Sequence, residues 1–432
     1  MRSAARLEAA SMTDTLRDED VSVDAAPPSG RVRRMFSALH YRDFRLLWTG
    51  AFISTTGTWM QTVAQSWIVL AMTGSAFLLG FDAFLATLPM ILFSLLGGVA
   101  ADRVDRRKLL LMSQYLQLTF AFTMAGLIWF ERIEVWHIFL LSFLTGTAQS
   151  FGGPAFQSLM PTLVKRADVP NAVAMNSIQF NLARVIGPVL AGGALAAFGA
   201  AACFGLNGLS FVAVIIVLWM IRSPFTPEKN VSASVMGDIR AGLRFMRERR
   251  ALMHLSLFAF IGTFFGVPLV TLLPVVATKL LGVGATGYSW ILAAYGAGSV
   301  GGAFFVAAAG HSERKGRVAI VSQLVFSLCL FAFAFSRSLW LSMALIFVAG
   351  AALISMIAMV SSLVQLATVD AMRGRVMSIF LLAFRGGMPL GNLTAGFLAE
   401  RFSVTAALAT NALCLAAAGT LYMLGRTEVR KL

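Results

Sequence analysis

Residues 176–188 read Asn-Ser-Ile-Gln-Phe-Asn-Leu-Ala-Arg-Val-Ile-Gly-Pro, and residues 377–389 read Met-Ser-Ile-Phe-Leu-Leu-Ala-Phe-Arg-Gly-Gly-Met-Pro. The two stretches share a Ser-Ile pair, an arginine and a proline. Arg184 therefore corresponds to Arg385 at an offset of 201 residues, which also relates the two prolines. An offset of nearly half the 432-residue chain indicates a duplicated unit. Repeated halves are typical of secondary transporters, which rock two helix bundles about a central site.

The composition around this repeat is that of a membrane protein. Hydrophobic residues make up 58% of the chain, its mean hydropathy is +0.78, and charged residues make up only 13%, about half the proportion in soluble domains. One membrane span needs ~20 apolar residues, and windows of that kind predict an all-α protein with twelve spans, six in each half. The predicted spans are residues 45–71, 76–101, 109–130, 137–160, 172–199, 201–221, 254–281, 286–309, 317–335, 339–365, 374–399 and 403–424.

The positive residues sort to one side of the predicted membrane. Of the 35 Lys and Arg residues, two lie inside spans and four lie in loops on one side, so that the other 29 share the side of the N-terminus. Because short loops rich in Lys and Arg resist translocation, both termini are expected in the cytoplasm of a bacterial cell whose inner membrane the chain crosses. The net charge of +15 is mostly this topology signal and does not indicate a nucleic-acid partner.

The spans divide the chain into a bundle at residues 35–221 and a second bundle at residues 254–424. Between them we expect a cytoplasmic linker at residues 222–253. Residues 1–34 are polar and predict a disordered cytoplasmic tail, and residues 425–432 form a second tail. The three cysteines lie in predicted spans and the chain has no cluster of metal-ligating residues, so that we expect no disulfide framework, metal or cofactor.

Three charged residues lie well inside spans, namely Asp82, Arg184 and Arg385. A charge within the bilayer is a functional hypothesis by default, because it costs ~2.5–3.5 kcal/mol on insertion scales. Asp82 is the natural proton-accepting or gating residue. A permanent ion pair or a hydrogen-bonded link between helices explains it equally well. For the two arginines, bracing of the core is favoured over substrate contact.

Polar residues that could line a cavity are few. Gln61 and Gln65 share one face of the first span with Trp59 nearby, Gln149 lies in the fourth span, and Gln365 ends the tenth. A mostly apolar cavity with a few amides and aromatic rings suits an amphipathic small molecule. Ordinary hydrogen bonding between helices is the alternative explanation for these residues.

Pairs of glycines four residues apart allow helices to approach closely. Such pairs are Gly298 with Gly302 in the eighth span and Gly387 with Gly391 in the eleventh. Tight packing is their usual role, but on helices that meet between the halves they would also permit a sliding contact.

The loop between the second and third spans carries the most specific motif, Gly-Gly-Val-Ala-Ala-Asp-Arg-Val-Asp-Arg-Arg-Lys at residues 97–108. From Gly98 onward it resembles the signature of the major facilitator superfamily, Gly-x-x-x-Asp-Arg-x-Gly-Arg-Arg/Lys, with Asp105 in place of the second glycine. The resemblance implies two pseudo-symmetric six-helix bundles, with a cavity between spans one, four, seven and ten. It also implies that this loop acts as a conformational latch on the cytoplasmic face. The latch residues are Gly98, Asp102, Arg103, Arg106 and Arg107.

The fifth span resembles the antiporter motif of the same superfamily, Gly-x-x-x-Gly-Pro-x-x-Gly-Gly, through Gly187, Pro188 and Gly192. Ala183 and Ala191 replace two of its glycines. The match favours export over import. The fourth-span motif of the family has an arginine three residues before a glutamine, whereas Gly146 precedes Gln149 here, so that the usual proton relay is incomplete.

Four further segments extend the resemblance over residues 36–424, to the bacterial branch that contains enterobactin exporters and macrolide efflux pumps. They are residues 41–48, 58–61, 171–177 and 373–378. The resemblance implies proton-coupled efflux of a small organic molecule, by a monomer whose partners are its substrate, protons and the lipid bilayer. It also implies that Arg385 is the partner of Asp82, because spans two and eleven are neighbours in that fold.

Other classes of membrane protein fit less well. A channel would need rings of like polar groups, and a membrane-bound enzyme would need clustered catalytic residues, whereas the four histidines lie near span ends. An ATP-driven pump would need a phosphate-binding loop that the sequence lacks. An importer of the same superfamily remains the nearest alternative.

Overall fold

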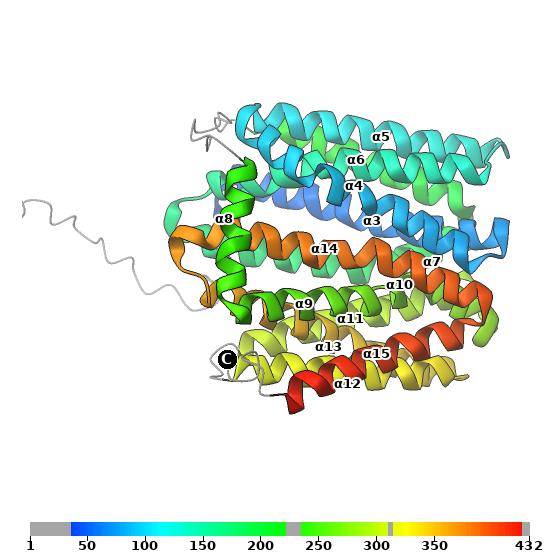
Figure 1. The fold of residues 1–432 in the computed structure, drawn as a ribbon. Coiled ribbons are helices and arrows are strands. Elements are labelled where there is room, and N and C mark those ends of the chain that lie inside the picture. Colours follow the sequence, from blue (N-terminus) through cyan, green and yellow to red (C-terminus); the bar gives the residue numbers. More distant parts are fainter. Residues whose placement is uncertain (1–35, 222–234, 310–313, 426–432) are drawn as a thin grey trace, which may run out of the picture. The chain divides into compact units, whose positions relative to one another are not determined.

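The computed structural model describes residues 36–221, 235–309 and 314–425, and the following concerns the unit that begins at Ala38. Almost all of these residues are helical (Figure 1). The helices are α3 (Arg42–Thr73), α4 (Ala76–Arg103), α5 (Arg106–Trp129), α6 (Val135–Leu159), α7 (Val169–Met220), α8 (Val235–Glu248), α9 (Arg250–Gly266), α10 (Pro268–Val275), α11 (Ala285–Ala309), α12 (Lys315–Phe335), α13 (Leu339–Leu366), α14 (Asp370–Arg401) and α15 (Val404–Leu424), with short 3₁₀ segments at Met160–Leu163 and Arg166–Asp168 and a π-helical turn at Val276–Leu280. The predicted tails, at residues 1–34 and 425–432, lie outside the described residues except for Gly425.

The described helices contain the predicted spans. Nine helical segments are long and apolar enough to cross a membrane by length and composition, within the part of the chain that the structure describes. One of them includes α7, which holds two spans because Gly199 interrupts its helical geometry with φ 75°. A residue with a side chain rarely adopts this positive φ, whereas glycine does so readily. Helices α3 and α6 have the length of spans but carry more polar residues, and with them the prediction of a twelve-helix all-α protein is confirmed.

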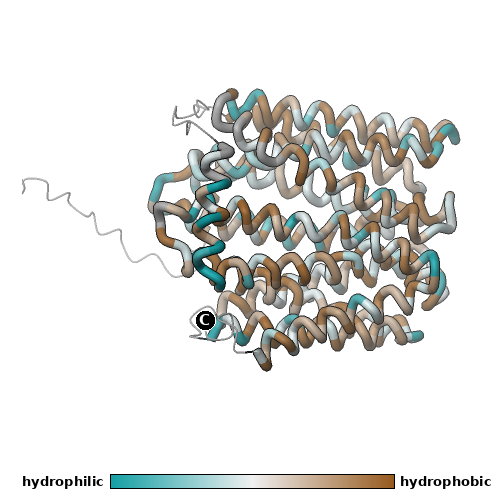
Figure 2. Tube along the Cα trace, viewed as in Figure 1, coloured by the Kyte–Doolittle hydropathy of each residue, from teal (hydrophilic) through white to brown (hydrophobic). Residues whose placement is uncertain are grey.

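Large apolar side chains point away from the packed helices, as expected for a surface that faces lipid. Examples are Trp340, Phe304 and Leu421, which are 77%, 71% and 72% exposed. Figure 2 shows apolar residues along the full length of most helices, whereas α8 is largely hydrophilic. In a soluble protein such an extent of exposed apolar surface would favour aggregation, and in a bilayer it is the surface that lipid covers.

The helices pack as two groups in chain order, α3–α7 and α9–α15. Within the first group α3 packs on α7 and α4 on α6, and within the second α11 packs on α13 and α9 on α14. The two groups meet where α4 packs on α14 and where α7 packs on α11. We call the end of the helices that carries Arg106, Arg314 and Arg373 the basic end, and the end that carries Gly74 and Glu400 the far end.

A helix lies inside the segment that we expected only as a linker. Helix α8 crosses the basic end of the bundle (Figure 1) and packs on α9 and α14. Its apolar face includes the fully buried Met246, while Arg240, Arg244 and Arg247 are exposed. This amphipathic pattern explains why the segment forms a helix on the protein surface and does not cross the membrane. The rest of the predicted linker before α8, residues 222–234, lies outside the described residues.

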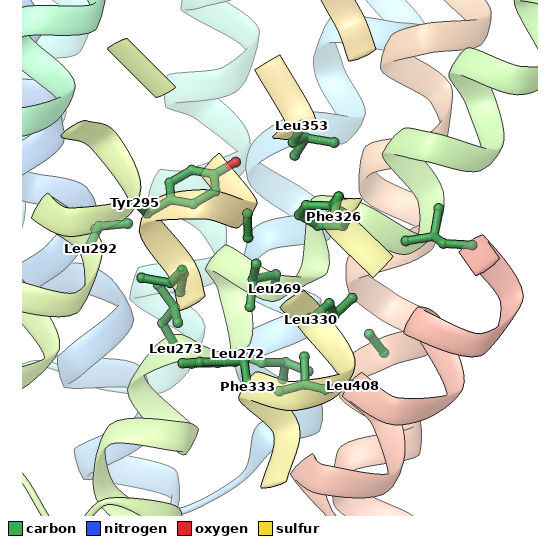
Figure 3. Close-up of a cluster of buried hydrophobic side chains, with 14 of the residues drawn as sticks. Leu269, Leu272, Leu273, Leu292, Tyr295, Phe326, Leu330, Phe333, Leu353 and Leu408 are labelled. Carbon is green, nitrogen blue, oxygen red and sulfur yellow. The ribbon is translucent and has the colours of Figure 1, made fainter. Parts of the chain in front are cut away.

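The second helix group has a tightly packed apolar core. Leu269, Leu272 and Leu273 of α10 lie among Phe326, Leu330 and Phe333 of α12 and residues of α11, α13 and α15 (Figure 3). Each of these six side chains is at most 1% exposed. Pro268 starts α10 and lacks the amide hydrogen that a helix interior needs, which is tolerated at a first helical turn. This half is therefore built around an apolar centre at the position of α10.

Candidate functional site

The first helix group, in contrast, encloses a cavity of about 460 Å³ whose largely apolar wall carries several polar side chains. It lies between α3, α5, α6 and α7, in the parts of these helices nearer the basic end. Hydroxyl, amide and aromatic side chains share its wall with apolar ones, as in pockets for small organic molecules. The polar and aromatic lining residues are Ser54, Thr55, Thr58, Trp59, Thr62, Ser113, Gln114, Gln117, Gln149, Phe156, Gln157, Asn176, Gln179, Phe180 and Phe211.

Of the five residues predicted for a substrate cavity, the structure places Trp59 and Gln149 at this wall. Gln61 does not line it and instead accepts a 2.6 Å hydrogen bond from Asn207 of the sixth span. Gln65 bonds to other helices, as described below. Gln365 is exposed near the basic end of α13, away from this cavity. Gln61 and Gln65 thus make hydrogen bonds between helices, and Gln365 is exposed.

The contribution of α5 was missed by the sequence analysis. Gln114 and Gln117 lie three residues apart on one face of this helix and both line the cavity. The Nε2 of Gln117 donates to Ser113, but the Oε1 of Gln114 is buried and has no hydrogen-bond partner among the described residues. A buried acceptor of this kind costs ~1–3 kcal/mol unless a donor reaches it. The pair of glutamines on one face of a predicted span was the signal that could have revealed this wall.

Asp82 is buried at 4% exposure and joins three helices through hydrogen bonds. Its Oδ2 accepts from Gln65 Nε2 of α3 at 2.8 Å, and its Oδ1 accepts from Ser142 Oγ of α6 at 2.5 Å. Gln65 also donates to Ser142 at 2.8 Å, which closes a triangle. Each member therefore has a partner, and Asp82 links the first, second and fourth spans in the half of the bundle nearer the far end.

The predicted pairing of Asp82 with Arg385 does not form. Their helices, α4 and α14, are neighbours as expected. Among the described residues, however, the partners of Asp82 are two neutral side chains of its own helix group, and no ion pair joins it to Arg385. Helix adjacency fixes which backbones meet, but it does not fix the direction of a side chain on each helix.

Arg184 lies at mid-length in the first span of α7, against two aromatic rings. Its guanidinium carbon is 5.3 Å from the ring centre of Trp59 and 5.2 Å from that of Phe180. Its Nε is buried without a hydrogen-bond partner. Contacts of a cation with a ring contribute roughly 0.5–2 kcal/mol each, which is comparable to the ~2.5–3.5 kcal/mol cost of an arginine in a membrane. The rings therefore stabilise Arg184 where no acid does so among the described residues.

The latch motif is only partly described. Among the described residues no atom lies where a Cβ of Gly98 would be, and Gly97, not Gly98, is the glycine that packs against the backbone of Ser150 in α6. Asp105, at the position of the family glycine, caps α5 by accepting from the backbone N–H groups of Arg107 and Lys108 at 2.9 and 3.2 Å. The substitution therefore replaces a flexible residue with a helix cap.

The arginines of the latch motif contact α6 and α7. Arg106 donates to the carbonyl of Ser158 at 3.4 Å, and the Arg107 guanidinium lies 5.3 Å from the ring centre of Trp219. These contacts connect the loop after α4 to the basic ends of two other helices in the same group. The side chains of Asp102 and Arg103 lie outside the described residues.

The antiporter motif lies where α7 approaches two other helices. A Cβ at Gly187 would meet Trp59 and the carbonyl of Thr56 in α3, and a Cβ at Gly192 would meet Ser289 in α11. Pro188 is buried between them. Ala183 and Ala191, which replace family glycines, are both 0% exposed. Small residues at these positions allow α7 to pack on both helix groups at once.

The close contacts between the two helix groups lie elsewhere than at the predicted glycine pairs. Gly298 and Gly302 face α13, and Gly387 and Gly391 face α9, so that both pairs pack within the second group. The suggested sliding contact at these pairs is therefore wrong. Close approaches that do join the groups, among the described residues, are Gly80 with Asn392, Gly192 with Ser289, Gly296 with Arg184, and Gly396 with Ala76.

At the far end, polar contacts add to these approaches. Glu400 of α14 accepts from the backbone N–H of Ala76 in α4 at 2.7 Å. Lys279, which follows α10, donates to the carbonyl of Gly74 at 3.4 Å. The contacts just described that join the two helix groups lie either at the middle of the helices or toward the far end.

Comparison with known proteins shows to which family this chain belongs. A family model for transmembrane secretion effectors matches residues 34–431. The multidrug efflux pump Tap of Mycolicibacterium fortuitum is 24% identical over 365 residues, which span 82% of this chain and 88% of that protein. The enterobactin exporter EntS of Shigella boydii is 26% identical over 397 residues, 90% of this chain and 92% of that protein. A crystal structure of a D-xylose-proton symporter matches with a TM-score of 0.73 at 12% identity, over 90% of this chain and 99% of that one, and shows the shared fold.

Proposed function

Because the chain belongs to the transmembrane secretion effector family of the major facilitator superfamily, we propose that it exports a small amphipathic organic molecule in exchange for protons. The observation that carries this proposal is the cavity between α3, α5, α6 and α7. Its amides, hydroxyls and four aromatic side chains suit a molecule with apolar and polar parts. Similarity to a multidrug pump and to an enterobactin exporter supports a drug or a siderophore as the cargo.

The conformation agrees with loading from the cytoplasm. With the basic end in the cytoplasm, as its Lys and Arg residues favour, the cavity lies in the cytoplasmic half of the protein. The named contacts between the helix groups lie at mid-depth or toward the opposite side. An exporter collects its substrate in such a state and releases it after the far end opens. In this scheme the latch residues Asp102, Arg103, Arg106 and Arg107 hold the basic end closed in the opposite state.

Asp82 is the proposed proton-binding residue. It is the one carboxylate that the structure buries within the helices it describes, and its two partners are neutral. Protonation would place a hydrogen on a carboxylate that now only accepts, so that the hydroxyl of Ser142 would have to turn from donor to acceptor. Because the triangle joins α3, α4 and α6, this exchange changes the link between helices that line or flank the cavity.

Transport in everted membrane vesicles tests the proposal. Vesicles energised to be acidic inside are given siderophores, macrolides and dyes, and uptake is compared for the wild type and Asp82→Asn. Uptake that needs the pH gradient and fails in the variant supports antiport through Asp82. Uptake that survives the variant leaves Asp82 as a structural link. If no compound moves with the gradient, efflux is refuted and an importer becomes the better hypothesis.

A further inference from the structure

Arg184 is a partly buried cation for which the described residues supply no acid. No ion pair forms at its guanidinium within the part of the chain that the structure describes, and its Nε lacks a hydrogen-bond partner. Its close contacts are the faces of Trp59 and Phe180. Aromatic rings stabilise a cation, but they cannot accept hydrogen bonds from all five N–H groups of a guanidinium. Donors of Arg184 therefore remain available to a bound ligand.

The other charges inside the described helices do not neutralise Arg184. Asp82 is the one buried carboxylate among the described residues, and it is committed to Gln65 and Ser142. Arg385, the repeat counterpart of Arg184, has the same sign and also lacks an ion-pair partner in the described part of the chain. Two guanidinium groups and one carboxylate leave the interior of the bundle with excess positive charge, which favours binding of an anionic ligand.

The position of Arg184 connects this charge to the cavity. Trp59 and Phe180 both line the cavity and touch each other edge to face, with ring centres 6.3 Å apart. The guanidinium lies over both rings. On its other side, Gly296 of α11 packs against the backbone of Arg184, and the Tyr295 phenol lies near enough to interact with it electrostatically. Arg184 therefore lies between the cavity and the opposite helix group.

We propose that Arg184 recognises an acidic oxygen group on the exported molecule, while Trp59 and Phe180 hold the apolar or aromatic body to which that group is attached. The substrate class is thus an amphipathic organic anion, a carboxylate or an acidic phenol. This inference rests on the proposed function and narrows its cargo. A guanidinium suits the role because it stays charged and can form two parallel hydrogen bonds to one acid. If Arg184 only packed against the two rings, the cavity would show no preference for a charged ligand.

A matched pair of ligands tests this without transport. The full chain is purified into lipid nanodiscs, and equilibrium binding of pyrene-1-butyrate and of its methyl ester is followed by fluorescence, with signals from empty nanodiscs subtracted. The wild type should bind the acid about tenfold tighter than the ester, the factor expected for one charge-assisted hydrogen bond. In Arg184→Gln the preference should fall to about twofold or less, and Arg184→Lys should retain part of it.

A control variant and a folding check accompany the test. Arg132→Gln removes the same charge from an exposed position at the far end and should keep the tenfold preference. Because Arg184→Gln keeps the cavity rings, its binding of the ester should stay within about twofold of the wild type, which also reports that the variant is folded.

Three results would overturn the proposal. They are failure of the acid to bind the wild type, equal binding of acid and ester by the wild type, and a preference that survives in Arg184→Gln. The assay uses no ion gradient, so that loss of proton-driven efflux in vesicles would refute the proposed antiport and leave this result standing. Conversely, gradient-driven transport of neutral compounds alone would support the antiporter and refute the anionic cargo.

Discussion

The carboxylate of Glu400, at the far end of α14, accepts a 2.7 Å hydrogen bond from the backbone N–H of Ala76, the first residue of α4. An acid of the second helix group thus satisfies an orphan amide at the start of a helix in the first group. A negative charge there also complements the positive end of the helix dipole. The contact exists only while the two groups are together at this end, so that it stabilises the closed far end.

Removal of this acid should loosen the start of α4. In Glu400→Ala the amides of Ala76 and Phe77 should exchange with deuterium about fivefold faster, since loss of a cap costs ~1 kcal/mol. Hydrogen exchange followed by mass spectrometry of peptides from this turn measures the change. Glu131→Gln removes an exposed acid from the same end and should leave the rate unaltered. Equal rates in Glu400→Ala and the wild type would show that the contact does not hold the far end closed.

The triangle of Asp82, Gln65 and Ser142 should behave as a coupled unit. Ser142→Ala leaves the buried carboxylate with one partner fewer and should lower the free energy of unfolding by ~1–3 kcal/mol. The same change in an Asp82→Asn background should cost less, because a neutral amide needs the hydroxyl less. Denaturant unfolding of the four proteins gives the coupling energy, and strictly additive effects would refute a shared network.

Gly97 and Gly98 offer a matched pair of substitutions. A Cβ at Gly97 would overlap the backbone of Ser150, whereas a Cβ at Gly98 would meet no atom of the described residues. Gly97→Ala should therefore destabilise the protein by ~1–3 kcal/mol through forced separation of α4 and α6, and Gly98→Ala should be neutral. Thermal unfolding of the purified variants provides the comparison. If Gly98→Ala were instead the more destabilising variant, the close contact of α4 with α6 would depend on Gly98 and not on Gly97.

At the basic end, Tyr41 donates a 2.7 Å hydrogen bond to Asp168, which raises the pKa of the Tyr41 phenol. A raised pKa in the folded protein means that this contact stabilises it at neutral pH. The contribution is lost as the pH rises through and above the ordinary tyrosine pKa of about 10. Tyr41→Phe should therefore lower the unfolding temperature at pH 7.5 and make less difference near pH 11. A difference that is constant with pH would refute this contribution.

Hydropathy alone was enough to predict the membrane-spanning helices, although not α8, because lipid requires long apolar segments whose ends are marked by charges and glycines. The break at Gly199 follows from the same reasoning, since a run of small residues there separates two spans. The offset between Arg184 and Arg385 likewise predicted two related halves. These are properties of the backbone and of whole segments, which a one-dimensional pattern records.

Side-chain directions could not be predicted in this way. Asp82 bonds to Gln65 and Ser142, and not to Arg385, because a turn of α4 by a fraction of a helical period decides which neighbour it meets. Gly97 packs where the motif indicated Gly98 for the same reason. Gln114 escaped notice because one amide barely changes the mean hydropathy of a span, although its place on the helix sets it in the cavity wall.

The contrast between the apolar core around α10 and the cavity in the first helix group has a consequence for engineering. If the proposed function holds, the two halves have diverged so that the first of them reads the chemistry of the cargo. A chimaera that joins residues 35–221 of this chain to the second half of a related exporter should inherit the selectivity of this chain. Resistance-altering substitutions selected in the laboratory should accordingly gather in α3, α5, α6 and α7.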